Sequence, residues 1–162
     1  AAQDLRIAGR AWELGKGLLL GVNKIDLGID RKAWLENFLE RFHPGRWIPV
    51  MFVSARDGTG VGRILPAAWR VAEARKSSLS TPVLNETLER AVSEVQPPSP
   101  GGRPLKFFYV TQTGTAPPRL LVFCNRPEEI PDNYRRYLEN SLRNLLDLKG
   151  VPLVISYRRR EH

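Results

Sequence analysis

The sequence predicts an α/β domain over residues 1–79 followed by an α+β domain over residues 80–162. Three observations support this division. Helix and strand patterns alternate through the first half, as they do in parallel α/β sheets. A polar stretch at residues 77–80 interrupts the pattern, and Thr81-Pro82 then places an N-cap residue before a proline at the first helical position. The second half has the order helix, strand, strand, helix, strand.

The first half is expected to form three helices and two strands. Apolar residues recur at helical spacing, for example at Leu5, Ala8 and Trp12. The two strands are short continuous apolar runs, which are typical of strands buried on both faces of a parallel sheet. In the third helix the apolar face is expected to include Leu65 and Trp69. The expected elements are a helix over 4–14, a strand over 18–22, a helix over 31–42, a strand over 48–53 and a helix over 61–74.

The second half is expected to form a three-stranded sheet covered by helices, in the order αββαβ. Its first strand alternates, which places Leu105, Phe107 and Tyr109 on one face. A turn at residues 114–118 predicts a hairpin between the first two strands. The expected elements are a helix starting at Thr81, strands over 105–112 and 119–125, a helix over 132–146 and a strand over 153–157.

The composition favours a soluble protein with a polyanionic partner. The chain carries a net charge of +8 with a pI near 10.1, and arginine outnumbers lysine 19 to 6. Guanidinium groups bind phosphate in a bidentate fashion, so nucleic acid is the natural partner class. A solvated basic surface explains the same charge equally well.

Several classes of protein are disfavoured. No apolar run approaches the roughly 20 residues that span a bilayer, and no secretory signal opens the chain, so we expect a cytoplasmic protein without a membrane partner. Cys124 is the only cysteine and is assigned to the core. No metal site is expected. Residue 1 is alanine and Met51 is the only methionine, which predicts that the chain is part of a longer protein.

The strongest local motif is Asn23-Lys24-Ile25-Asp26, directly after the first predicted strand. Ligands of open α/β sheets bind outside the carboxyl ends of the strands. The Asp26 carboxylate can accept hydrogen bonds from N1–H and the exocyclic amine of guanine, a pair that adenine does not offer. Asn23 can fix the loop and the base edge, and the stem of Lys24 can lie over the ring. A polar loop with a helix-capping Asp26 is the alternative.

A second motif, Ser54-Ala55-Arg56, follows the next parallel strand. In P-loop GTPases this position supplies a backbone N–H to guanine O6 and a serine that steadies the aspartate. The paired loops therefore resemble the guanine-reading half of the translation-factor-type GTPase superfamily, with Arg56 in place of the more common lysine.

The phosphate-binding half of such a domain is missing from the sequence. No G-x-x-x-x-G-K-[ST] loop occurs. Residues 57–60 match the Asp-x-x-Gly switch by letter, but they follow the Ser-Ala loop and are interpreted as a turn. We therefore expect no catalytic residues in this chain, and magnesium binding only together with the missing half.

Junction segments extend the resemblance to the whole chain. These segments resemble the Der (EngA) family of bacterial GTPases: residues 3–9, 81–85 and 102–106, Tyr109-x-Thr111-Gln112, Pro117-Pro118, residues 135–143 and Gly150-x-Pro152. The resemblance implies the C-terminal half of a second G domain (a partial P-loop fold) followed by a KH-like domain. It also implies a parent GTPase that binds GTP and GDP and acts in maturation of the large ribosomal subunit. Implied partners are ribosomal RNA, that subunit and the preceding G domains of the parent. The alternative is an RNA- or protein-binding module with a vestigial nucleotide site, which an upstream Walker loop would exclude.

RNA contact by the second domain has to be argued from charge. No two glycines have the Gly-x-x-Gly spacing with which ordinary KH domains grip nucleotides. Arginines on the last helix are expected to project together from the domain, and a further group extends the last strand. The candidate phosphate-binding residues are Arg135, Arg136, Arg143, Arg158, Arg159 and Arg160. The alternative is that these arginines form ion pairs with Glu128, Glu129 and Glu139 or pack against the neighbouring G domain.

Overall fold

A computed structural model describes residues 2–160, apart from the side chain of residue 145. The chain divides into two compact units. The first comprises Ala1–Lys76 together with Leu148–Pro152, and the second comprises Ser77–Asp147 and Leu153–His162. The return of Leu148–Pro152 to the first unit has no counterpart in the sequence-based division at residue 79.

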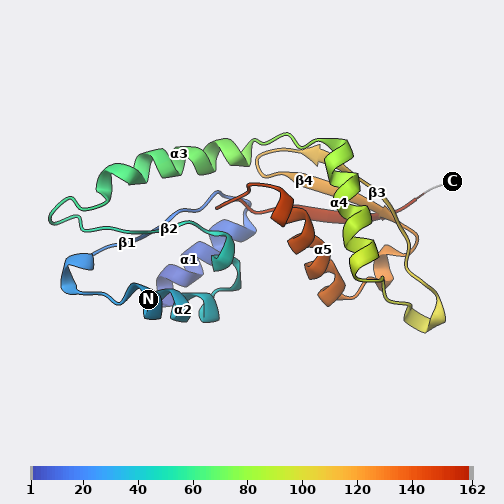
Figure 1. Ribbon diagram of the computed structural model, residues 1–162, viewed down its shortest axis with the longest axis horizontal. Coiled ribbons are helices and arrows are strands. Elements are labelled where there is room, and N and C mark those ends of the chain that lie inside the picture. Colours follow the sequence, from blue (N-terminus) through green and yellow to red (C-terminus); the bar gives the residue numbers. More distant parts are fainter. Residues whose placement is uncertain (1, 161–162) are drawn as a thin grey trace. The chain divides into compact units, whose positions relative to one another are not determined.

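The first unit has the predicted element order (Figure 1). The short strands β1 and β2 pair in parallel, with Leu20 opposite Val50. Short 3₁₀ helices lie at Ile25–Leu27, His43–Trp47 and Val61–Arg63. The main elements are α1 (Ala2–Glu13), β1 (Leu20–Val22), α2 (Arg31–Arg41), β2 (Val50–Phe52) and α3 (Ile64–Arg75).

Local sequence explains where helix α2 begins and how the core forms around it. Asp30 caps the helix, since its side chain accepts hydrogen bonds from the backbone N–H groups of Lys32 and Ala33 at 3.0 and 3.1 Å. Phe38 of α2 and Phe42, which directly follows the helix, form a buried cluster with Ile48, against which α1 packs its predicted apolar face. This packing follows the 3.6-residue spacing of the sequence.

Two sequence-based expectations for this unit are wrong. Neither strand is buried on both faces: Gly21 of β1 is exposed, and all three residues of β2 are only half-buried. Helix α3 buries Ala67 and Val71, while Leu65 and Trp69 remain 78% and 67% exposed. A narrow sheet covers only one stripe of a helix that is apolar over a wider arc, so the larger side chains stay outside the core.

Gly150 joins the distant segment Leu148–Pro152 to the first unit. Its N–H donates to the Trp47 carbonyl at 2.6 Å, and its own carbonyl accepts from the Leu18 N–H at 2.7 Å. Its φ of +76° lies in the left-handed region, and an added Cβ would lie 2.3 Å from the Leu18 carbonyl oxygen. Only glycine fits this position without strain.

The second unit has the predicted αββαβ order (Figure 1). Strand β3 pairs antiparallel with β4, which pairs in parallel with β5. The N-cap of α4 is Ser80, one residue before the expected Thr81. The elements are α4 (Thr81–Glu94), β3 (Phe107–Gly114), β4 (Arg119–Cys124), α5 (Asp132–Leu145) and β5 (Val154–Arg159).

Helices α4 and α5 are joined by hydrogen bonds from two tyrosines of α5. Tyr134 Oη donates to the Val95 carbonyl and Tyr137 Oη to the Ala91 carbonyl, both at 2.8 Å. Asn85 of α4 holds strand β3 through its amide group, which donates to the Val110 carbonyl and accepts from the Val110 N–H at 2.9 Å each. The sheet face carrying Val110 and Val122 is therefore the buried one.

The first strand of this sheet contains an irregularity that changes which residues face the core. The register shifts between Phe107 and Tyr109, so that Phe107 lies opposite Cys124 and Tyr109 opposite Phe123. Phe107 stacks on Tyr134 of α5, whereas Tyr109 is exposed and stacks on Phe123. The expectation that Phe107 and Tyr109 share a face is wrong, because a β-bulge inserts one residue into the alternation.

Within residues 2–160, none of the helices is both long enough and apolar enough to cross a membrane.

Candidate functional site

The two polar loops of the first unit lie together because they follow neighbouring parallel strands. The Val53 N–H donates to the Val22 carbonyl at 2.9 Å, and the Ile25 N–H donates to the Val53 carbonyl at 3.2 Å. These bonds carry the pairing of β1 and β2 past the ends of the strands. They place residues 23–26 beside residues 54–56, as the parallel arrangement requires.

Asn23 links the loops through one atom. Its Oδ1 accepts a hydrogen bond from the Lys24 N–H at 2.8 Å and another from the Ala55 N–H at 2.9 Å. Lys24 has a φ of 67°, a left-handed conformation that turns the chain sharply after Asn23. The Ala55 N–H, which the resemblance assigns to guanine O6, is thus bonded to Asn23 in this structure.

Asp26 is held by the second loop. Ser54 is fully buried, and its Oγ donates to Asp26 Oδ1 at 2.9 Å. Arg56 Nη1 lies 3.9 Å from Asp26 Oδ2, with the Arg56 side chain 84% exposed and that of Asp26 17% exposed. An ion pair so open to solvent contributes little to stability. The carboxylate is therefore oriented mainly by Ser54 and keeps acceptor capacity for a ligand that donates two hydrogen bonds.

Residues 57–60 form a turn behind this site, as the sequence predicted. Asp57 Oδ1 accepts from the Thr59 N–H at 2.9 Å, and the hydrogen bonds with Thr59 lower the pKa of Asp57 below its usual 3.8. The Ser54 N–H donates to the Thr59 carbonyl at 2.9 Å, so the turn closes on the residue that orients Asp26.

The arginines of helix α5 do not project together, and this expectation is wrong. Arg143 is 2% exposed, lies 3.3 Å from Glu139 and has its pKa lowered by burial. Arg135 donates to the Ile130 and Pro127 carbonyls at 3.1 and 2.6 Å. Only Arg136 of the three is exposed. The helix turns by about 100° per residue, so Arg136 and Arg143, seven residues apart, share a face while Arg135 lies about 100° away. Spacing alone does not decide exposure, because a long arginine side chain can pack inward, as that of Arg143 does.

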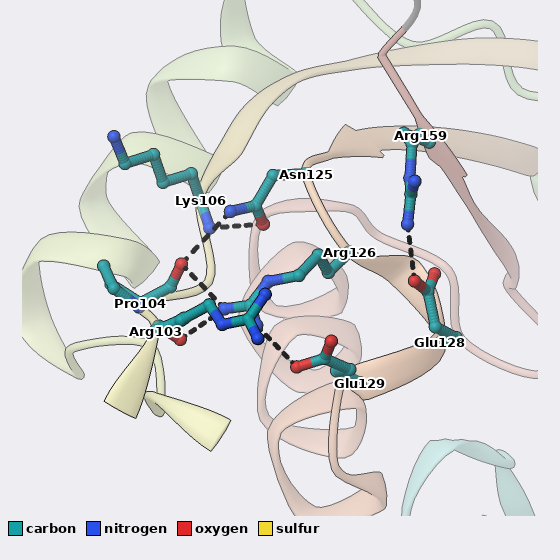
Figure 2. Close-up of polar contacts among 8 residues, drawn as sticks. All are labelled: Arg103, Pro104, Lys106, Asn125, Arg126, Glu128, Glu129 and Arg159. Atoms are coloured by element: carbon teal, nitrogen blue, oxygen red, sulfur yellow. Dashed lines mark hydrogen bonds and ion pairs between the residues drawn. The ribbon is translucent and has the colours of Figure 1, made fainter. Parts of the chain in front are cut away.

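The arginines of the last strand divide between roles. Arg159 Nη2 donates to Glu128 Oε1 at 2.6 Å, as Figure 2 shows. Arg160 lies with its guanidinium carbon 5.3 Å from the centre of the Phe108 ring. Arg158 is exposed, opposite Phe123 in the sheet register. The ion-pair alternative thus applies to Arg143 and Arg159 but leaves Arg158 exposed.

Arg126 organises a polar network that no sequence motif predicted (Figure 2). Its guanidinium donates to Glu129 at 2.6 Å, to the Pro104 carbonyl at 3.2 Å and to the Arg103 carbonyl. Adjacent Asn125 donates to the same Pro104 carbonyl at 3.1 Å. The network secures the chain before β3 and is structural in role.

Cys124 is buried in β4, and burial raises the pKa of its thiol. Across residues 2–160 no three histidine, cysteine or carboxylate side chains cluster as metal ligands do.

Comparison with known proteins identifies the second unit. Residues 78–158 match the family model described as the KH-domain-like region of EngA bacterial GTPase enzymes, C-terminal. Three curated relatives are each named GTPase Der. The one from Caldanaerobacter subterraneus subsp. tengcongensis is 37% identical over 98% of this chain and 37% of its own length. Those from Desulforudis audaxviator and Cereibacter sphaeroides are 41% and 40% identical over 98% and 96% of this chain, or 37% and 33% of their own lengths.

The αββαβ unit is therefore a KH-like domain of the kind found at the C-terminus of bacterial EngA GTPases. The chain belongs to the Der (EngA) family. It spans about a third of the length of the curated relatives that it matches.

Proposed function

We propose that the first unit recognises the guanine base in a GTP-binding protein of ribosome biogenesis, and that the second unit binds ribosomal RNA. The observation that carries the first part is the paired contact between the loops. Asn23 bonds to Ala55, and Ser54 bonds to Asp26. A carboxylate prepared in this way at the carboxyl end of a parallel sheet suits a base that presents two adjacent donors.

Guanine recognition assigns a role to each residue of the two motifs. Asp26 accepts from N1–H and the exocyclic amine, with Ser54 fixing its orientation. The Ala55 N–H contacts O6 after exchanging its bond with Asn23, and the Asn23 amide then faces the base edge. The stem of Lys24 covers one ring face, while Ile25 and Arg56 frame the pocket.

The first unit is proposed to be the C-terminal half of a second G domain with a partial P-loop fold. Its two-stranded sheet and the exposed apolar residues Ile7, Leu65 and Trp69 support this, because further strands of such a domain would cover them. Phosphate and magnesium binding then belong to preceding parts of a longer parent GTPase. This chain alone is expected to hydrolyse no GTP, and a malachite-green assay should equal the buffer blank at any magnesium concentration. Hydrolysis that survives repurification contradicts the assignment.

The base-reading role is tested in the longer parent protein with Asp26→Asn. Asparagine offers a donor where the 2-oxo group of xanthine offers an acceptor, so GTP binding should weaken and XTP binding should strengthen. Competition binding with GTP, XTP and ATP measures the change. Unchanged GTP affinity in the variant overturns the assignment.

The RNA-binding role of the second unit is supported by its KH-like family match and by the excess positive charge of the chain. We propose the large ribosomal subunit as the partner, in the cytoplasm, together with the other G domains of the parent. Phosphate contacts predict an affinity that falls with salt by a log–log slope of about 0.7 to 0.9 per phosphate neutralised.

A further inference from the structure

The second unit has an aromatic and basic surface on the side of its sheet opposite the buried face. Residues directly opposite in a sheet point to the same side. The buried row of the sheet is Val110, Val122 and Tyr157, so the adjacent rows face away from the core. We call these two rows the open sheet face: Tyr109, Phe123 and Arg158, then Thr111, Leu121 and Ser156.

The aromatic pair on this face has the geometry of a stacking platform. The rings of Tyr109 and Phe123 lie 4.3 Å apart at an interplanar angle of 18°. Tyr109 nevertheless remains 39% exposed, so its ring offers apolar surface to a further planar group. Aromatic rings on sheets bind successive unstacked bases with little sequence preference.

The charged side chains in the described rows of this face are arginines. Arg158 lies directly opposite Phe123, and the next row of the same face carries Arg119 opposite Val154. Arg160 extends beyond the strand and covers Phe108 at 5.3 Å. The two rows and Arg119 include no carboxylate. An aromatic pair with Arg158 in its own row and Arg119 on the same face complements a polyanion that also presents flat rings.

We propose that the open sheet face binds single-stranded RNA, with a base stacked on Tyr109 beside Phe123 and the flanking phosphates held by Arg158 and Arg160. This proposal rests on the proposed RNA-binding role and specifies which surface binds RNA and how the bases are held. Base stacking requires unpaired nucleotides, so duplex RNA is disfavoured. A protein partner for this face would have to be acidic to match the same arginines, and it is the alternative outcome of the test.

The chain offers a matched pair of charge variants on adjacent residues. Arg158→Gln removes a charge from the open sheet face, whereas Arg159→Gln removes the same charge from the side chain paired with Glu128. Tyr109→Leu removes the ring while keeping an apolar residue in the strand. Circular dichroism melting of each variant separates loss of fold from loss of binding.

The probe is a labelled single-stranded oligouridylate of about 12 nucleotides, a length that fills a typical single-strand site. Its binding to the 162-residue chain is compared with the binding of the same oligonucleotide in a duplex. Tyr109→Leu should weaken single-strand binding about tenfold with an unchanged salt slope. Arg158→Gln should lower the slope by about 0.7, and Arg159→Gln should change neither quantity. If the Tyr109→Leu chain melts normally and binds single-stranded RNA as tightly as the wild type, the open-face proposal is overturned. The open sheet face would then be left to a protein partner. A wild-type chain that binds neither RNA instead overturns the RNA-binding role itself.

Discussion

The loops of the first unit and the last strand of the second unit hold their polar groups in opposite ways. In the loops, Asn23 and Asp26 are bonded to the neighbouring segment at 2.9 Å, and all the groups meet at one end of a sheet. In the last strand, successive arginines point to opposite faces, where Arg159 meets Glu128 and Arg158 lies beside Phe123. A site built at strand ends is concentrated by topology. Successive side chains of a strand point to opposite faces of the sheet, so a run of arginines in one strand does not form a single charged surface.

The largest effect is expected at Gly150, on which the first unit depends although the residue lies near the end of the chain. Gly150→Ala should destabilise this unit by roughly 3 kcal/mol or more, because a left-handed conformation costs about 1–2 kcal/mol and overpacking adds about as much again. Tryptophan fluorescence during urea unfolding reports on the first unit alone, since Trp12, Trp34, Trp47 and Trp69 all belong to it.

Gly28→Ala is the matched control in the same unit. Gly28 has a φ of +74°, but an added Cβ there meets nothing within 4 Å. Gly28→Ala should therefore lower the free energy of unfolding only by the cost of the left-handed backbone conformation, about 1 kcal/mol. Equal losses in the two variants would show that Gly150 makes no close contact with Leu18.

Asn85→Ala should act on the second unit. The substitution removes the side-chain amide that hydrogen-bonds to the N–H and carbonyl of Val110. Leaving these two groups unsatisfied should lower the free energy of unfolding by about 2–3 kcal/mol. All four tyrosines belong to this unit, so tyrosine emission follows it. Ser93→Ala, on the exposed side of α4, is the control and should be nearly neutral. A neutral Asn85→Ala would mean that water replaces the amide at the sheet edge.

Arg143→Met distinguishes an arginine that serves the fold from one that serves a ligand. The side chain is buried and paired with Glu139 of the same helix, and its loss should lower the free energy of unfolding by about 1–2 kcal/mol while RNA affinity stays constant. Filter binding of RNA alongside thermal melting makes the comparison. Weaker RNA binding at unchanged stability is the opposite pattern and would restore Arg143 to the phosphate-binding set.

Ser54→Ala is expected to have the smallest effect on stability, about 1 kcal/mol for one hydrogen bond. Its consequence for function should be larger, since Asp26 loses the contact that orients it. In the longer parent, GTP affinity should therefore fall more than stability does. Thr59→Ala, which leaves the Ser54 hydroxyl in place, should retain GTP affinity.

The sequence predicted the element order and the paired loops because both depend on local signals. Apolar runs followed by Asn23 and Ser54 fix the ends of two strands, and parallel pairing then brings the loops together. It failed at Tyr109, because a bulge of one residue reverses the faces of a strand and has no distinct sequence signal here. It failed at Arg143 and Trp69, because helical spacing alone does not tell which side of a helix finds a partner. The role of Leu148–Pro152 depends on contacts distant in sequence.

We propose that the first unit reads the guanine base and that the second unit binds RNA. Nucleotide binding and RNA binding can be measured side by side in the longer parent carrying Asp26→Asn or Tyr109→Leu. Asp26→Asn should change the nucleotide preference from GTP to XTP and leave oligouridylate affinity unchanged. Tyr109→Leu should weaken RNA binding and leave nucleotide binding unchanged. An Asp26→Asn protein that still prefers GTP would show that the first unit does not read the guanine base through Asp26.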